Sequence, residues 1–95
     1  MKNNTVEQFL EYIEVGQEAY LIFQGRKYLV QGWHLADVGK EFMKMDDISD
    51  VPPWKPTWHC IENTMEACAR TFLNAPIFDG RSFLLAHPDI EWVDE

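Results

Sequence analysis

The chain has 95 residues and a formal net charge of −8, because 16 acidic side chains face eight basic ones. Its hydrophobic share of 46% is typical of a folded domain and excludes a disordered chain. The acidic excess disfavours direct nucleic-acid binding, because binding to a phosphate backbone depends on lysine and arginine side chains.

A first helix is predicted over residues 5–15, since Thr5 and Gln8 match a capping box and Gly16 gives a stop signal. Four apolar residues recur at helical spacing on one face: Val6, Phe9, Leu10 and Ile13. Three glutamates follow an adjoining face without an interleaved Lys or Arg: Glu7, Glu11 and Glu14. This acidic stripe is a candidate binding surface for a basic partner, and an ordinary solvated helix face is the alternative.

A β-hairpin is predicted next, with strands over residues 18–24 and 27–35 and a type II′ turn at Gly25 and Arg26. Apolar residues resume from Phe42 to Met45 and predict a third strand, which makes the sheet a meander. The alternative is a helix from Leu35 to Met45, in which Gly39 would cost about 1 kcal/mol relative to alanine.

Residues 46–57 are predicted to form a stiff loop, because three prolines interrupt regular pairing there. We expect Trp54 to hold this loop over the core; the alternative is that Pro53 and Pro56 form a PxxP ligand for an adaptor domain. Three acids in or beside the loop form a second candidate partner-binding cluster: Asp46, Asp47 and Asp50.

The second half predicts a short strand over Trp58–Glu62, with Trp58 and Cys60 on one face and His59 and Ile61 on the other. A second helix follows, capped by Asn63 and running to about Asn74. Turn signals at residues 79–80 and a helical turn capped by Ser82 come next. Residues 89–95 are expected to form an edge strand or a tail held by Trp92.

Together these elements predict one α+β domain over residues 1–95. An N-terminal helix and a second helix pack on one face of a three- to four-stranded antiparallel meander, and a short C-terminal turn and tail follow. The expected helix core consists of Phe9, Leu10, Phe72 and Leu73. The opposite face of the sheet is either covered or an exposed apolar patch, because the strands carry apolar residues of both parities.

No motif for catalysis or cofactor binding is found. The side-chain types that zinc prefers occur at His34, His59, His87, Cys60 and Cys68, but their spacing matches no structural zinc site, so no metal is expected. Neither serine lies in a nucleophile elbow, and no base is identified beside either cysteine. The glycines fit turns and form no phosphate-binding loop, so no cofactor is expected. A pair of catalytic carboxylates stays open, given sixteen acids.

Three segments carry a resemblance: FQGRKYLVQGW at residues 23–33, FLNAPIFDGRSF at 72–83 and IEWV at 90–93. They resemble short uncharacterised proteins of bacteria and mobile elements, which implies a bacterial or phage origin and a fold but no active site. The order of helix, three strands and helix is also similar to the double-stranded-RNA-binding domain. That domain has a basic cluster where this chain has Asn63, Met65 and Glu66, so RNA binding is not implied.

The sequence therefore predicts a non-catalytic, cytoplasmic protein-interaction module that binds a partner with a basic surface, and in its sharpest form an inhibitor that mimics nucleic-acid charge. Neither nucleic acid nor a membrane is an expected partner, since no apolar segment reaches the roughly 18 residues needed to span a bilayer. The alternatives are a small-ligand or metal-binding protein and a protein that self-associates through an uncovered sheet face; monomer and homodimer both stay open.

Overall fold

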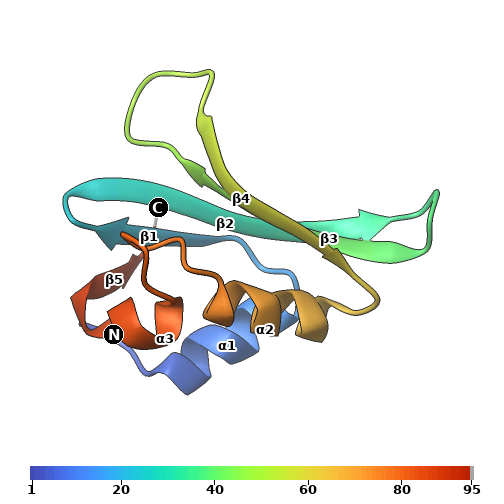
Figure 1. The fold of residues 1–95 in the computed structure, drawn as a ribbon, viewed down its shortest axis with the longest axis horizontal. Helices are drawn as coiled ribbons and strands as arrows, with labels where there is room; N and C mark the ends of the chain where they lie inside the picture. The colour runs from blue at the N-terminus through green and yellow to red at the C-terminus, as the bar shows by residue number, and fades with distance from the viewer. Residues whose placement is uncertain (95) are drawn as a thin grey trace.

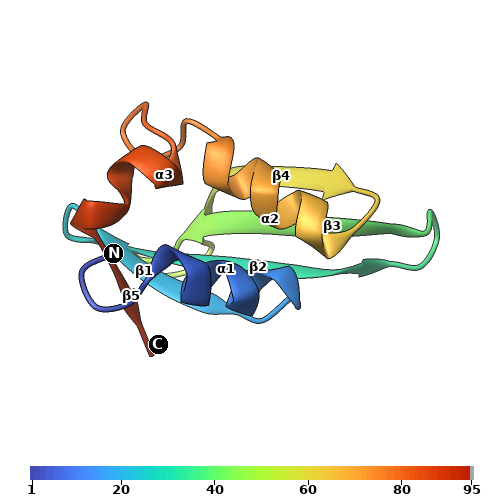
Figure 2. The ribbon, with the colours of Figure 1, turned by 90° about the horizontal axis from the view of Figure 1, so that it is seen from below.

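A computed structural model describes residues 1–94 and shows a five-stranded antiparallel sheet with all three α-helices on one face (Figures 1 and 2). The strand order is β4-β3-β2-β1-β5. In chain order the elements are α1 (Val6–Glu14), β1 (Ala19–Phe23), β2 (Arg26–Leu35), β3 (Lys40–Asp47), β4 (Lys55–Glu62), α2 (Met65–Asn74), α3 (Phe83–Ala86), a 3-10 turn (His87–Asp89) and β5 (Ile90–Val93). The predicted α+β class is confirmed.

Helix α1 begins with the predicted capping box. The Thr5 side chain accepts a hydrogen bond from the Gln8 backbone N–H, and the Gln8 side chain accepts one from the Thr5 N–H in return. Both bonds satisfy N–H groups that have no partner within the helix. Phe9 and Ile13 are fully buried, so the predicted apolar face is the face that packs on the sheet.

The β1–β2 turn differs from the prediction by one residue. Its central residues are Gln24 and Gly25, both with positive φ (51° and 75°), and Phe23 pairs with Arg26 across it. This geometry is typical of a type I′ turn, whose twist matches that of the flanking strands. The predicted type II′ turn at Gly25 and Arg26 is wrong, because Arg26 is already paired as the first residue of β2.

The strand interpretation of residues 40–45 is confirmed, since β3 pairs with β2 from Lys40 to Asp47. The proline-rich loop is shorter than predicted: β3 extends through Asp47, and β4 begins at Lys55. Pro56 is tolerated there because β4 is an edge strand and its register with β3 shifts at Met45/Asp46.

Trp54 does not cover the core, contrary to expectation. Its side chain is 45% exposed. Two hydrogen bonds to the backbone of Lys27 hold the start of the loop instead. The Ile48 N–H donates to the Lys27 carbonyl at 2.8 Å, and the Lys27 N–H donates to the Ser49 hydroxyl at 2.7 Å. These bonds give the segment an attachment to β2 that does not need the tryptophan.

The N-cap of α2 is Thr64, so the predicted cap at Asn63 is wrong. The Thr64 hydroxyl accepts a hydrogen bond from the Ala67 N–H at 3.0 Å. The Asn63 side chain instead accepts a hydrogen bond from Lys40 Nζ at 2.5 Å. The predicted cap of the short helix α3 is confirmed, because the Ser82 hydroxyl accepts from the Leu85 N–H.

Of the two outcomes expected for residues 89–95, an edge strand or a tail, the structure shows the edge strand over Ile90–Val93, and residue 95 lies outside the described residues. β5 pairs antiparallel with β1, so that Ile90 lies opposite Phe23 and Trp92 lies opposite Leu21. No helix within residues 1–94 is long and apolar enough to cross a membrane.

The core lies between the helices and one face of the sheet and is rich in aromatic rings. Phe9 stacks on Phe83 at a centroid distance of 4.9 Å, and Phe72 lies 5.6 Å from Phe83 and 5.4 Å from Trp58. The sheet contributes the alternate residues of β1 that are buried, which are Ala19, Leu21 and Phe23. Of the four predicted helix-core residues, Phe9, Phe72 and Leu73 are buried, and Leu10 packs on the core while half-buried.

We predict that Phe72→Ala lowers the free energy of unfolding by about 3 to 5 kcal/mol, because it removes a fully buried ring that contacts four other aromatic rings. Urea unfolding followed by circular dichroism measures the change. Leu84→Ala is the control, since Leu84 is exposed on α3 and its loss leaves no buried cavity. An equal effect of the two variants would contradict the assigned core.

We also predict that Thr64→Ala destabilises the protein by about 1 kcal/mol through loss of the α2 cap, whereas Asn63→Ala changes stability by less than about 0.5 kcal/mol. The two residues are adjacent and polar, so the pair is a matched test of which one caps the helix. A larger loss of stability in Asn63→Ala than in Thr64→Ala, in the same unfolding assay, would show that Asn63 caps the helix, as the sequence predicted.

Candidate interaction surfaces

The three glutamates of the acidic stripe lie on α1, away from its buried face. Glu7 and Glu11 are exposed, and Glu14 is half-buried. The last turn of α1 contains no basic residue, and within residues 1–94 none of the three forms an ion pair with a lysine or arginine. The structure therefore brings Glu7, Glu11 and Glu14 together as one uncompensated negative surface.

The second acidic cluster is divided by the fold. Asp46 is only 3% exposed and pairs with Lys44 Nζ at 2.8 Å. Asp47 and Asp50 converge on the Arg26 guanidinium, at 3.0 and 2.9 Å. These three carboxylates thus share two cations, Asp50 remains 80% exposed, and Asp46 is not available to a partner.

Asp47 has a defined electrostatic role beside Arg26. Burial raises the pKa of its carboxyl, but hydrogen bonds from Ser49 and the Arg26 charge outweigh burial and hold the pKa below its ordinary value of 3.8. A lowered pKa in the folded state means that the ionised Asp47 stabilises the fold above the unfolded-state pKa. This contribution is lost as the pH falls through the folded-state value.

The two cysteines face the core from neighbouring elements. Cys60 lies on β4 and Cys68 on α2, and the Cys60 thiol lies 4.0 Å from the Cys68 carbonyl. Burial raises the pKa of the Cys60 thiol to about 12, and it raises the pKa of Cys68 as well. Both groups therefore stay protonated near neutral pH, in which form they are poor nucleophiles and poor metal ligands.

The histidines are dispersed. His59 stacks on Phe42 at 5.9 Å, His34 pairs with Glu41, and His87 contacts the Met1 amino group. In the part of the chain that the structure describes, no three His, Cys, Asp or Glu side chains are grouped to hold a metal ion. The five residues that zinc would prefer are thus not brought together.

The face of the sheet opposite the helices carries exposed aromatic and apolar side chains. Trp33, Phe42 and Ile61 lie opposite one another on β2, β3 and β4, and Trp33 and Ile61 are 43% and 50% exposed. Together with His59 these three residues form the open-face patch. Lys44 Nζ lies 6.0 Å from the Trp33 ring centre.

The sequence left two outcomes for this face, covered or exposed, and the structure shows both in different parts: Trp33 and Ile61 are exposed, whereas Leu29 and Asp46 on the same face are only 5% and 3% exposed. The alternation of Trp58 and Cys60 with His59 and Ile61 is confirmed, because the first pair packs against the core and the second is exposed. That alternation is the sequence signal that predicts His59 and Ile61 on one face of β4. The positions of Trp33 and Phe42 beside them could be found only from the strand register of the structure.

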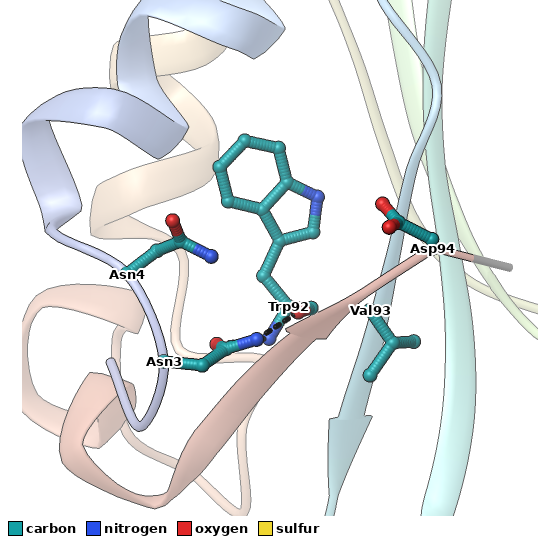
Figure 3. A pocket seen from close by; sticks show the side chains of 5 residues that line it. All are labelled: Asn3, Asn4, Trp92, Val93 and Asp94. Atoms are coloured by element: carbon teal, nitrogen blue, oxygen red, sulfur yellow. Dashed lines mark hydrogen bonds between the residues drawn. The ribbon is translucent and has the colours of Figure 1, made fainter.

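A shallow hollow lies where the two ends of the chain meet (Figure 3). It is lined by Asn3, Asn4, Trp92, Val93 and Asp94. The Asn3 side chain donates to the Trp92 carbonyl and accepts from the Trp92 N–H, so its amide already has partners. Asp94 is the only titratable side chain among these lining residues, and the hollow therefore offers no acid and base pair for catalysis.

No protein-family model, no curated protein and no solved structure matches this chain. The likeness to short bacterial proteins therefore stays a prediction, and the functional argument depends on the geometry of the surfaces.

We predict that iodoacetamide modifies Cys60 slowly in the native protein at pH 8, because a thiol with a pKa of about 12 has only about 10⁻⁴ of its population as thiolate. Mass spectrometry over time, compared with the same reaction in concentrated urea, measures the difference. Labelling at equal rates in the two conditions would show that Cys60 is not held as a buried thiol.

Proposed function

We propose that this chain is a non-catalytic interaction module that binds a partner with a basic surface through the acidic stripe of α1. The observation that carries the proposal is that Glu7, Glu11 and Glu14 share one helix face and have no cationic partner within residues 1–94. Like charges at this spacing destabilise an isolated helix by a few tenths of a kcal/mol per pair, and a basic partner would remove that cost.

The distribution of cations supports this assignment. Arg26, Lys44, Arg70 and Arg81 each lie within 4.0 Å of a carboxylate. These are four of the eight basic residues, and none of the four pairs involves a glutamate of the stripe on α1. A net charge of −8 would also steer a basic protein toward the module over a distance of about one Debye length.

The sharper form of the proposal is an inhibitor of bacterial or phage origin that occupies the basic groove of a nucleic-acid-binding protein. A row of carboxylates along a helix offers negative charges in the way that a phosphate backbone does. The stripe is assigned this role in preference to Asp46, Asp47 and Asp50, because those carboxylates already bind Lys44 and Arg26.

The test is capture of partners from a nuclease-treated extract of the source cell on the immobilised chain, with identification by mass spectrometry. The triple variant Glu7→Gln, Glu11→Gln and Glu14→Gln is expected to weaken the affinity for a captured basic protein by about tenfold or more. Raising the salt from about 0.05 to about 0.3 M should weaken wild-type binding by a similar factor.

The matched control removes three other exposed negative charges, in the variant Asp37→Asn, Glu66→Gln and Asp79→Asn. Both triple variants have the same net charge, so a general charge effect would weaken them equally. Equal weakening, or an affinity that does not respond to the stripe variant, would reject α1 as the binding surface.

A further inference from the structure

The two edge strands of the sheet, β5 and β4, differ in whether another segment of the chain bonds to their outer edge. At β5, Asn3 exchanges two hydrogen bonds with the backbone of Trp92, and the Lys2 N–H donates to the Ile90 carbonyl at 3.0 Å. At β4, the outer edge receives no backbone hydrogen bond from any other segment of residues 1–94. An unpaired strand edge is a template for pairing with another strand, so β4 is the open edge of this sheet.

The open-face patch leads to that edge. Trp33 lies opposite Phe42, and Phe42 lies opposite Ile61, so the three side chains form one row from β2 to β4. The row ends at Ile61, which is half exposed because no further strand covers it. Beside it His59 stacks on Phe42. A strand added along β4 would extend the row and cover Ile61.

We propose that two copies of this chain pair antiparallel through their β4 edges and form one continuous sheet. The charges of β4 favour a second copy as the occupant. Lys55 begins the strand and Glu62 ends it, and Thr57 is the extra residue of β4 at its register shift with β3. In antiparallel pairing with His59 opposite His59, and with Thr57 left unpaired in each copy, Lys55 of each copy lies opposite Glu62 of the other. Residues 58–62 contain no proline, so each backbone N–H of this stretch that points away from β3 can pair with an added strand.

This pairing is independent of the proposed function and compatible with it. Helix α1 contacts β2 and α2, and β4 lies two strands beyond β2 in the sheet. The acidic stripe therefore stays uncovered in the pair. A dimer would present two stripes, and a partner with two basic sites would bind with higher avidity.

Sedimentation equilibrium of the pure chain tests the pairing without any other protein. The chain concentration is varied from about 5 to about 500 μM, because an interface smaller than that of a typical stable complex is expected to be weak. The average mass is expected to rise from 11.2 kDa toward twice that value as the concentration increases. A mass of 11.2 kDa at every concentration would overturn the proposal.

Three lysine variants locate the interface. Ile61→Lys is expected to weaken association by about tenfold or more, because it places a charge at the edge. Trp33→Lys is expected to leave association unchanged, since Trp33 lies on β2, two strands from that edge. Leu85→Lys, at an exposed position of α3, is the control for added charge. Association lost equally in Trp33→Lys would indicate stacking of open faces, and association lost in Leu85→Lys would indicate contact through α3. Either result rejects edge pairing.

Amide hydrogen exchange of the wild-type chain gives a second readout that does not depend on a variant folding. Edge pairing predicts that the outward-pointing N–H groups of residues 58–62 exchange more slowly at high concentration. The exchange rate should fall by about the ratio of paired to unpaired chains at that concentration. Exchange at these residues that is independent of concentration, while the mass rises, would overturn pairing through β4.

Discussion

The packing of Phe9, Phe72 and Phe83 against one face of the sheet is the interaction on which the rest of the structure depends. These rings come from three different helices, and each is fully buried. Their burial supplies a large share of the hydrophobic driving force for a domain of this size. Because they all lie on the same side of the sheet, the helices cover that side alone.

One-sided packing explains the character of the other face. Alternate residues of a strand point to opposite faces, so burying Met43 against the helices places Phe42 on the uncovered side. The same alternation places Cys60 in the core and Ile61 at the surface. The open-face patch is therefore a direct consequence of where the helices pack.

The charges of the molecule are arranged by the same geometry. The antiparallel register brings β2 beside β3 and the loop that follows it, so Arg26 meets Asp47 and Asp50 although they are distant in sequence. Helix α1 turns its apolar face inward, and its three glutamates, of which Glu7 and Glu11 are exposed, form no ion pair with a lysine or arginine of residues 1–94. The two acidic groups of the sequence thus differ in the structure: Asp46, Asp47 and Asp50 pair with Lys44 and Arg26, whereas the stripe of α1 has no such pair within residues 1–94.

Local interactions were predictable from the sequence alone: the capping box of Thr5 and Gln8, the cap of α3 at Ser82, the helical and strand periodicities, and the α+β class. These features depend on residues three or four positions apart or on simple alternation. The tertiary structure decided the Gln24–Gly25 turn, the cap at Thr64, the extension of β4 through Pro56 and the burial of Asp46. The turn, the start of β4 and the burial of Asp46 opposite Leu29 follow from the strand register, and Asn63 is held by Lys40, which is distant in sequence; a local pattern contains no information about either.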